Sequence, residues 1–167
     1  MYKRQIYTGA KFTRLYFKDC YIDGTTDFIF GPSTALFEDC IIHSKRNSYV
    51  TAASTPKEAK YGYVFKHCKL TAEPGVDKVY LGRPWRPYAY TLFIECELGK
   101  HIVPAGWHNW GKQSNEETAR YMEYKNTGEG ANVSERVAWS KQLTKKEAEA
   151  VTVDAIFRTQ SDWNPID

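Results

Sequence analysis

The sequence lacks the features that mark several broad classes of protein. No apolar run in its 167 residues approaches the roughly 18 residues of a membrane-spanning helix. Charged residues follow Met1 without the apolar segment of a signal peptide. The net charge of +3 is spread along the chain without a basic block. We therefore expect neither a membrane nor a nucleic acid as partner, and the charge mildly favours a polyanionic substrate.

Motifs for serine, metal and cofactor chemistry are also missing. There is no Gly-x-Ser-x-Gly sequence, so serine hydrolase chemistry has no support. There is no Cys-x-x-Cys pair and no close cluster of Cys and His. The four histidines, His43, His67, His101 and His108, show no ligand spacing, and we expect them at the surface or at the rim of a cleft. We predict no metal and no cofactor.

What the chain does contain is an internal repeat with the pattern Phe-x-x-Cys-x-(Ile/Leu). All four cysteines of the protein, Cys20, Cys40, Cys68 and Cys96, occupy its fourth position, at successive intervals of 20, 28 and 28 residues. A period in the twenties with short, β-rich units is typical of a solenoid.

The repeat predicts an all-β fold, a parallel β-helix. Each coil accommodates two or three short strands, and stacking of the coils about 4.8 Å apart makes parallel sheets. Phe, Cys and Ile/Leu would then form ladders that face inward. Four cysteines could form two disulfides in three pairings, but their shared position favours a stack of small buried hydrophobic side chains.

The C-terminal part differs from the coils. We expect coils over about residues 6–110, followed by a loop and a helical tail over 111–167. Thr144 and Glu147 form a capping box that predicts a helix over 143–150, and 153–157 is expected to add a short helical turn. Such terminal segments pack along a solenoid or cap its end.

One carboxylate interrupts an apolar, β-branched and aromatic stretch. Asp27 lies within Gly24–Gly31, which otherwise has the composition of a short buried strand. Ionised carboxylates are rarely buried without a partner. Asp27 is therefore either a structural residue bonded to a nearby turn or part of a functional site.

The stretch Leu81–Trp85 favours the functional interpretation. Arg83 follows Asp27 by 56 residues, twice the interval of 28, so stacked coils bring the two to one face about 10 Å apart. A guanidinium would keep Asp27 ionised and oriented, and such a carboxylate can act as a nucleophile. Trp85 would point the same way along a strand and could stack on a sugar ring.

These residues resemble the pectin methylesterases, also called pectinesterases. Gly24–Gly31 is similar to the nucleophile motif of that family, and Leu81–Trp85 matches its Leu-Gly-Arg-Pro-Trp motif in full. Three later segments, Gly106–Trp110, Glu123–Gly128 and Trp163–Pro165, resemble the end of family members. The resemblance covers about residues 6–167 and implies a right-handed parallel β-helix.

The resemblance also implies a reaction. Family members hydrolyse galacturonate methyl esters in pectin, the methyl-esterified homogalacturonan, and release methanol without a metal. Asp27 would be the nucleophile. Arg83 would hydrogen-bond and orient Asp27 and would also contribute to substrate binding, while Trp85 and Phe30 would line the sugar site. We further expect a monomer, and a parent protein that is secreted, periplasmic or at the cell surface.

The beginning of the chain departs from the family pattern. The second catalytic Asp of the family, the acid/base, corresponds to Arg4, and the glutamine that stabilises the oxyanion has no counterpart. Residues Met1–Gln5 therefore resemble a non-native leader on a partial pectinesterase domain. General acid–base help is worth about 10²–10⁴ in rate and one oxyanion donor about 10²–10³. We expect a chain that is impaired or inactive.

Other functions stay open. The chain could be a β-helix that binds pectin without turnover, a purely structural solenoid, or a polysaccharide lyase or hydrolase on the same fold. Calcium dependence with an unsaturated product would indicate a lyase, methanol an esterase, and binding without either product a binding module.

Overall fold

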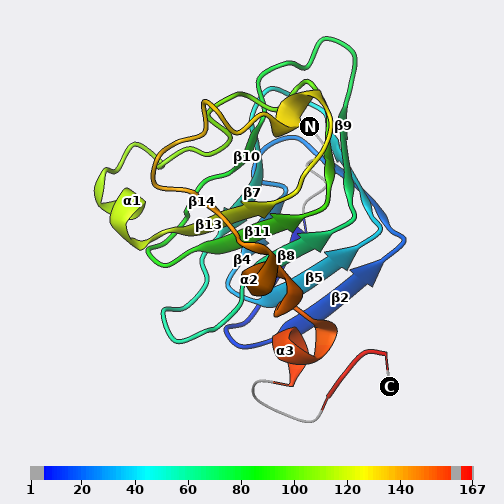
Figure 1. Ribbon diagram of the computed structural model, residues 1–167, viewed down its shortest axis with the longest axis vertical. Coiled ribbons are helices and arrows are strands. Elements are labelled where there is room, and N and C mark those ends of the chain that lie inside the picture. The colour runs from blue at the N-terminus through cyan, green and yellow to red at the C-terminus, as the bar shows by residue number, and fades with distance from the viewer. Residues whose placement is uncertain (1–5, 159–162, 167) are drawn as a thin grey trace.

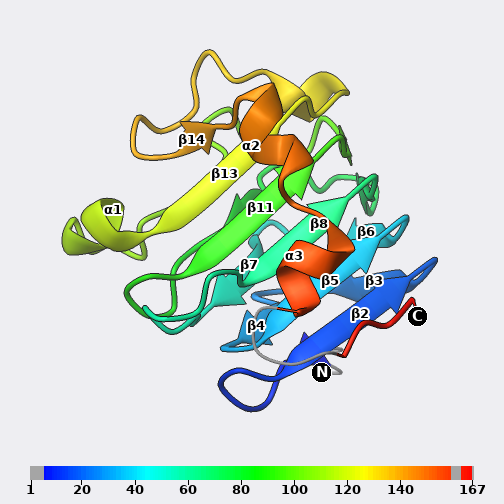
Figure 2. The ribbon, with the colours of Figure 1, turned by 60° about the horizontal axis from the view of Figure 1, so that its bottom comes forward.

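The computed structural model describes residues 6–158 and 163–166. Its strands form three sheets in which the pairings are parallel, and each of the first four coils gives one strand to each sheet (Figures 1 and 2). The first sheet contains β1 (Ile6–Tyr7), β4 (Ile29–Gly31), β7 (Tyr49–Ala53) and β10 (Tyr80–Gly82). The second contains β2 (Arg14–Lys18), β5 (Thr34–Glu38), β8 (Tyr63–Lys66), β11 (Tyr90–Ile94), β13 (Arg120–Tyr124) and β14 (Lys141–Gln142). The third contains β3 (Tyr21–Gly24), β6 (Ile41–Ser44), β9 (Lys69–Ala72) and β12 (Glu97–Leu98). The predicted fold class, a parallel β-helix with a helical tail, is confirmed.

The repeated phenylalanines form a continuous stack inside the coils. The rings of Phe17, Phe37, Phe65 and Phe93 follow one another at centroid distances of 4.8, 4.5 and 4.4 Å, with interplanar angles of 8° or less. Strand register places these residues opposite one another from β2 to β11. An identical side chain at each rung fills the same space in every coil, so the sequence period sets the register.

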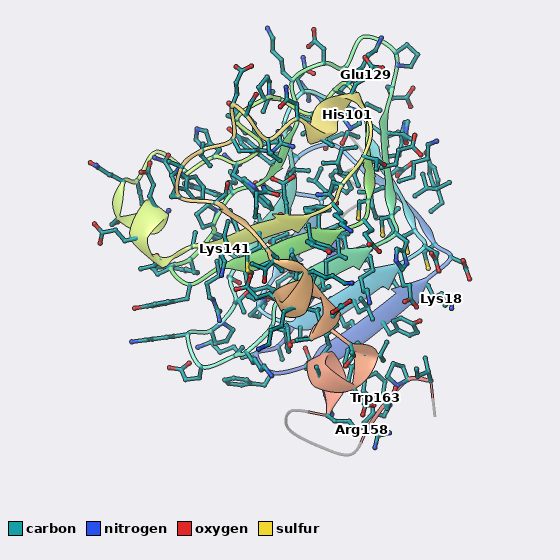
Figure 3. All side chains as sticks on the ribbon, viewed as in Figure 1. Lys18, His101, Glu129, Lys141, Arg158 and Trp163 are labelled. Carbon is teal, nitrogen blue, oxygen red and sulfur yellow. The ribbon has the colours of Figure 1, made fainter. Side chains whose placement is uncertain are left out.

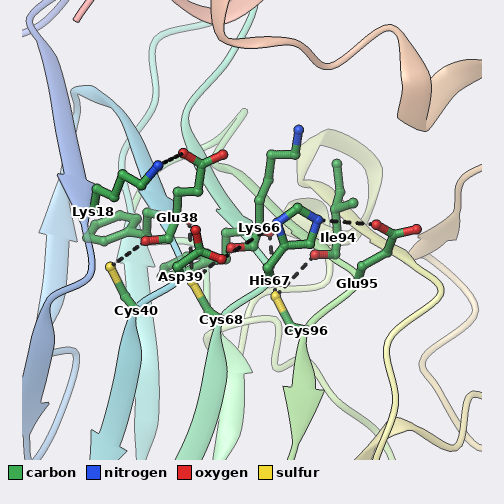
Figure 4. A network of polar contacts seen from close by, with 12 residues as sticks. Lys18, Glu38, Asp39, Cys40, Lys66, His67, Cys68, Ile94, Glu95 and Cys96 are labelled. Atoms are coloured by element: carbon green, nitrogen blue, oxygen red, sulfur yellow. Dashed lines mark hydrogen bonds and ion pairs between the residues drawn. The ribbon is translucent and has the colours of Figure 1, made fainter. Parts of the chain in front are cut away.

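The cysteines form a second internal ladder, as predicted. All four are free thiols, and Cys40, Cys68 and Cys96 are buried. Each of these three thiols donates a hydrogen bond to a carbonyl oxygen of the preceding coil, from Cys68 Sγ to the Phe37 carbonyl at 3.3 Å for example (Figure 4). The Cys68 thiol and burial raise the pKa of Cys40. The Cys40 thiol lowers the pKa of Cys68, but the Cys96 thiol and burial outweigh it and raise that pKa, so both thiols stay protonated.

A left-handed residue precedes each of the four cysteines, and Asn126 at the same position of the fifth coil, and turns the chain away from the second sheet. These residues have φ between 46° and 54° and are Asp19, Asp39, His67, Glu95 and Lys125. His67 lies between two carboxylates of the neighbouring coils, 3.8 Å from Asp39 and 3.3 Å from Glu95 (Figure 4). The hydrogen bond between His67 and Glu95 links two of these turns, in which left-handed backbone disfavours residues other than glycine.

The ladder extends past residue 110, where we expected the coils to end. β13 pairs with β11 along five residues and puts Glu123 opposite Phe93. Glu123 is 1% exposed and forms an ion pair with Arg136, whose Nε lies 2.8 Å from the Glu123 carboxylate. The indole nitrogen of Trp107 also donates to Glu123. A buried ion pair therefore replaces the aromatic side chain at the fifth rung.

The tail packs along the outside of the second sheet instead of covering an end of the solenoid (Figures 1 and 2). Its helices are α2 (Lys145–Glu149) and α3 (Val153–Phe157), and the Thr144–Glu147 capping box is present. Two further elements, α1 (Ser114–Thr118) and the 3-10 helix η1 (Glu129–Ala131), lie before the tail. The tail covers outward side chains of the central strands, which belong to an outer apolar cluster: Leu36, Val64, Leu92, Ala148, Val151, Ile156 and Phe157. Burial on both faces explains why these strands are almost continuously apolar.

The far end of the tail also reaches the first coil. The Arg14 side chain on β2 donates a hydrogen bond to the Phe157 carbonyl, and its guanidinium lies 5.3 Å from the Trp163 ring. Trp163 in turn packs edge-on against Phe157 at 5.2 Å, close to the end of α3 (Figure 3). The tail thus connects the last coil to the first.

His101 is buried, so its predicted surface position is wrong. The residue is 4% exposed, and its Nε2 atom has no hydrogen-bond partner in the part of the chain that the structure describes. It follows the short strand β12, where Gly99 leaves room for the imidazole. Burial, with a smaller effect from His43, lowers the pKa of His101 to about 4.

This pKa predicts a pH-dependent stability. The unfolded state binds a proton near pH 6.5 that the folded state binds only near pH 4, so stability is full above pH 6.5 and is lost toward pH 4. We expect the free energy of unfolding to fall by about 1–2 kcal/mol between pH 7 and pH 5 through this residue. In urea titrations at both pH values, His101→Gln should lose that part of the decrease. An unchanged pH dependence in the variant would rule out His101 as the cause.

The proposed leader Met1–Gln5, including Arg4, lies outside the described residues. Among the described residues, no helix has the length and apolar character needed to cross a bilayer.

Candidate active site

Asp27 lies in a turn, not in the middle of a strand as its surroundings suggested. The stretch Gly24–Gly31 is divided between the end of β3 and the strand β4, and Asp27 has a left-handed φ of 48°. Its amide donates to the Tyr49 carbonyl of the next coil at 2.9 Å. The chain leaves the third sheet and enters the first here, and this change of direction needs a turn. The carboxylate is consequently 19% exposed at the surface of the coil.

Arg83 binds Asp27 through two hydrogen bonds. Its Nε donates to Oδ1 at 2.9 Å and its Nη2 donates to Oδ2 at 2.6 Å. Arg83 follows β10, and the coil that contains β7 lies between the two residues. The sequence interval of 56 residues therefore brings them together as predicted. A bidentate guanidinium fixes the plane of the carboxylate and stabilises its ionised form.

Glycine is required directly before this arginine. A Cβ atom on Gly82 would lie 2.0 Å from Thr51 Oγ1 on the neighbouring strand. That hydroxyl donates to the Leu81 carbonyl, and the Arg83 amide donates to the Thr51 carbonyl at 3.0 Å. The close approach of β10 to β7 sets the position of the Arg83 side chain relative to the neighbouring coil.

Two aromatic rings hold the guanidinium from its faces. The Cζ atom of Arg83 lies 3.8 Å from the ring centroid of Tyr49 and 3.8 Å from that of Trp110. Two rings at that distance cannot share one face of the guanidinium, so Arg83 lies between them. Stacking and cation–π attraction restrict the rotation of the side chain. The bonds to Asp27 therefore fix the guanidinium within its plane, and the two rings fix it perpendicular to that plane.

His108 completes the aromatic surroundings of the arginine. Its ring lies 5.5 Å from Tyr49 and 5.4 Å from Tyr80, and its Nδ1 accepts a hydrogen bond from the Trp110 amide. Burial, with a smaller effect from Arg83, lowers the pKa of His108. The neutral imidazole leaves Asp27 as the charged partner of Arg83 and orients the backbone of Trp110.

The other two predicted site residues form an aromatic row beside the ion pair. Phe30 lies on β4, three residues after Asp27, and its ring is 6.0 Å from Trp85 and 5.0 Å from Tyr7. Trp85 and Tyr7 are 41% and 57% exposed. The row therefore offers open ring faces, which is the kind of surface that sugar rings contact.

Sequence reasoning missed Tyr49, Trp110 and Tyr7 as parts of this surface. The sequence signal for Trp110 was the segment Gly106–Trp110, which resembles family members. In the structure Trp107 of this segment pairs with Gly82 of the Leu-Gly-Arg-Pro-Trp motif, and this pairing brings Trp110 to Arg83. Nothing in the sequence around Tyr49 distinguishes it from an ordinary strand residue.

The arrangement supplies one oriented carboxylate in a partly open, aromatic setting. Such a carboxylate can attack an electrophilic carbon. Within the described ranges, no group of three or more His, Cys, Asp or Glu side chains could hold a metal ion.

Comparisons with known proteins identify the relatives of the chain. A family model described as Pectinesterase matches residues 1–160. The chain is 45% identical to pectinesterase 31 of Arabidopsis thaliana over 134 residues, 80% of this chain and 42% of that protein. It is 42% identical to putative pectinesterase 11 of the same plant over 151 residues, 89% of this chain and 42% of that protein.

Solved structures give the same result. Pectin methylesterase from carrot superposes with a TM-score of 0.82 at 35% identity, over 87% of this chain and 50% of that one. A pectin methylesterase in complex with a hexasaccharide superposes with a TM-score of 0.76 at 31% identity, over 91% and 52% of the two chains. The chain spans about half the length of these relatives or less. Because the family model matches most of its residues, the chain belongs to the pectinesterase family.

Proposed function

We propose that the chain carries the nucleophile of a carboxylic ester hydrolase that demethylates galacturonate methyl esters of pectin. The observation that carries this proposal is the bidentate ion pair between Asp27 and Arg83, whose guanidinium is stacked between Tyr49 and Trp110. Membership of the pectinesterase family supports the reaction type. The hexasaccharide complex of a similar protein supports a polysaccharide as ligand.

In the proposed reaction Asp27 attacks the ester carbonyl carbon. The bond from that carbon to the methoxy oxygen breaks, the methoxy group leaves as methanol after taking up a proton, and an acyl-enzyme anhydride remains. Water then cleaves the anhydride and returns the Asp27 carboxylate with a free galacturonate. Arg83 holds the carboxylate in one orientation, and Phe30 and Trp85 line the sugar site. We propose that the protein works as a monomer that is secreted, periplasmic or located at the cell surface.

The direct test is methanol release from highly methylated pectin by the purified chain. We expect methanol, no unsaturated product and no dependence on calcium. Unsaturated product that requires calcium would overturn the esterase in favour of a lyase. Binding of pectin without methanol, even after long incubation, would favour the binding module.

We propose further that turnover is slow because Arg4 stands where the resemblance puts the acid/base. A guanidinium stays protonated at neutral pH and neither donates nor takes up the proton of the leaving group. Arg4→Asp is expected to raise methanol release by about 10²-fold, within the range for general acid–base catalysis. Arg4→Asn is the matched control, because it removes the charge without adding a carboxylate. An equal rate in both variants would contradict a role for an acid at this position.

A further inference from the structure

Every donor of the buried Arg136 guanidinium is used within the protein. Its Nε donates to Glu123 Oε1 at 2.8 Å and its Nη2 donates to Oε2 at 3.2 Å. Its Nη1 donates to the carbonyls of Val103 and Pro104 at 3.3 and 2.8 Å, and Nη2 also donates to the Gly130 carbonyl at 2.6 Å. A guanidinium has five N–H donors, and these five bonds account for all of them. The ion pair therefore binds backbone from two separate loops.

Residues 103–107, which precede the active-site residue Trp110, contact this ion pair at two further points. The Trp107 indole nitrogen donates to Glu123 Oε1 at 3.3 Å. Gly106 has a left-handed φ of 70°, and a Cβ atom there would lie 2.5 Å from Arg136 Cδ. The buried pair thus determines where the backbone of residues 103–107 lies.

The opposite side of the same segment is bonded to the strand that precedes Arg83. The Leu81 amide donates to the Gly106 carbonyl at 2.8 Å, and the His108 amide donates to the Gly82 carbonyl at 3.1 Å. These two bonds extend the first sheet by one further rung beside β10. The position of the segment is therefore transmitted to the backbone directly before Arg83.

The segment also leads to the ring that covers one face of Arg83. The centroid of Trp110 lies 3.8 Å from Arg83 Cζ, and Arg83 in turn binds both carboxylate oxygens of Asp27. A shift of residues 103–107 would move both the backbone beside the arginine and the ring against it. Either change would alter the orientation of the guanidinium and of the carboxylate that it binds.

Apolar packing could fill the space of the buried pair without charges. Phe93 lies opposite Glu123 in the preceding coil and fills the equivalent space with a ring. Replacement of a buried ion pair by apolar side chains of similar volume is often neutral or stabilising. Apolar side chains, however, offer no donors to the carbonyls of Val103 and Pro104 and no acceptor to the indole of Trp107. The directional bonds to this segment are what the charged pair adds.

We propose that Glu123 and Arg136 are positioning residues for the active site. By fixing the segment that leads to Trp110, they hold the Arg83 guanidinium in the orientation that aligns the Asp27 carboxylate. The consequence for ester cleavage rests on the proposed function, whereas the restriction of Arg83 does not depend on it. Displacement of a reacting group by about 1 Å can lower a rate by about 10²-fold.

The Nε–H group of Arg83 reports the orientation of the guanidinium, because it donates to Asp27 Oδ1 at 2.9 Å. Its exchange with water is measured by ¹⁵N NMR on the purified chain, and its signal is identified by its loss in Arg83→Lys. In Glu123→Phe combined with Arg136→Met, apolar packing keeps the fold while residues 103–107 lose their bonds to the pair. We expect exchange of this proton to become at least about 10-fold faster in that variant.

Arg136→Lys separates the charge from the directional bonds. Lysine keeps a positive charge beside Glu123, but it has three donors on a flexible stem and cannot reproduce the five bonds of the guanidinium. Exchange of the Arg83 Nε–H should therefore also be faster in this variant. If the double variant does not fold, Arg136→Lys decides the question.

Leu36→Ala is the control for lost stability alone. Leu36 is fully buried in the outer apolar cluster, whereas Trp107 belongs to the inner core. A cavity at Leu36 destabilises the fold but leaves the bonds of residues 103–107 in place, so exchange should change less than about 2-fold. Unchanged exchange in a folded variant of Arg136 would overturn the proposal, as would equal acceleration in Leu36→Ala.

The methanol assay tests the consequence for the reaction. Both variants of Arg136 should lower kcat by about 10-fold, because the nucleophile is less well aligned. Unchanged kcat despite faster exchange would overturn the catalytic part of the proposal. Absence of methanol from the wild-type chain would instead overturn the proposed function, and the exchange result would still decide whether the pair positions Arg83. The two proposals therefore fail in different experiments.

Discussion

Replacing Asp27 by asparagine is expected to reduce methanol release from highly methylated pectin by at least about 10⁴-fold. The amide keeps the size of the side chain but is a very poor nucleophile, and it cannot form the two charge-assisted bonds that Arg83 now donates. Methanol release should be measured beside a reaction without enzyme. It should also be measured in the Arg4→Asp background, where a higher expected starting rate allows a larger reduction to be detected.

Asp19→Asn provides the matched control for this prediction. Asp19 also has a left-handed backbone, with φ of 53° against 48° for Asp27, so asparagine is tolerated equally at both sites. It lies in the turn after β2 and forms no recorded ion pair with Arg83. Methanol release that survives in Asp27→Asn would exclude Asp27 as nucleophile. Loss in both variants would point to a folding defect.

Arg136→Met is expected to lower the free energy of unfolding by about 3–5 kcal/mol. Arg136 and Glu123 have side chains that are only 4% and 1% exposed, and the arginine also donates to the carbonyls of Pro104 and Gly130. Methionine leaves the Glu123 carboxylate charged and buried without its partner. A loss of this size is a large share of the 5–15 kcal/mol that stabilises a typical domain.

Urea titration of three variants would test this expectation. Glu123→Phe combined with Arg136→Met restores the aromatic side chain that the four preceding rungs have, and should recover at least half of the lost free energy of unfolding. Lys145→Met removes one member of an exposed pair with Glu149 and should cost less than about 1 kcal/mol. If Arg136→Met costs no more than Lys145→Met, the buried pair does not stabilise the fold.

The coils could be predicted because their signal is repeated in the sequence. Phe and Cys recur at fixed positions and occupy ladders that touch from coil to coil. The fifth coil was missed because it keeps the spacing but changes the chemistry: Glu123 takes the place of Phe, and Asn126 that of Cys, where its side chain accepts from the Cys96 amide. A search for repeated residue types does not detect a coil that keeps the same backbone path but has polar residues at the repeat positions.

The site was predictable to a similar extent. The interval between Asp27 and Arg83 follows from the repeat, so their meeting could be inferred from period alone. The left-handed turn at Asp27 could not, because its neighbours have strand composition and the change of sheet is a property of the coil. Tyr49 and Trp110 hold the guanidinium from coils on either side in a way that depends on three-dimensional register. The roles of Asp27, Arg83, Trp85 and Phe30 remain predictions that the variants above would test.

The contact between the tail and the first coil changes how this solenoid should come apart. A stack of repeats normally frays from its ends, since each unit touches only its neighbours. Here Phe157 and Trp163 hold Arg14 on β2, while the rest of the tail covers β5, β8 and β11. Opening the first coil therefore requires release of the last helix as well. The tail thus links the first coil to the last through continuous contacts. Without the tail, unfolding should change from one cooperative transition to stepwise fraying of the coils from their ends.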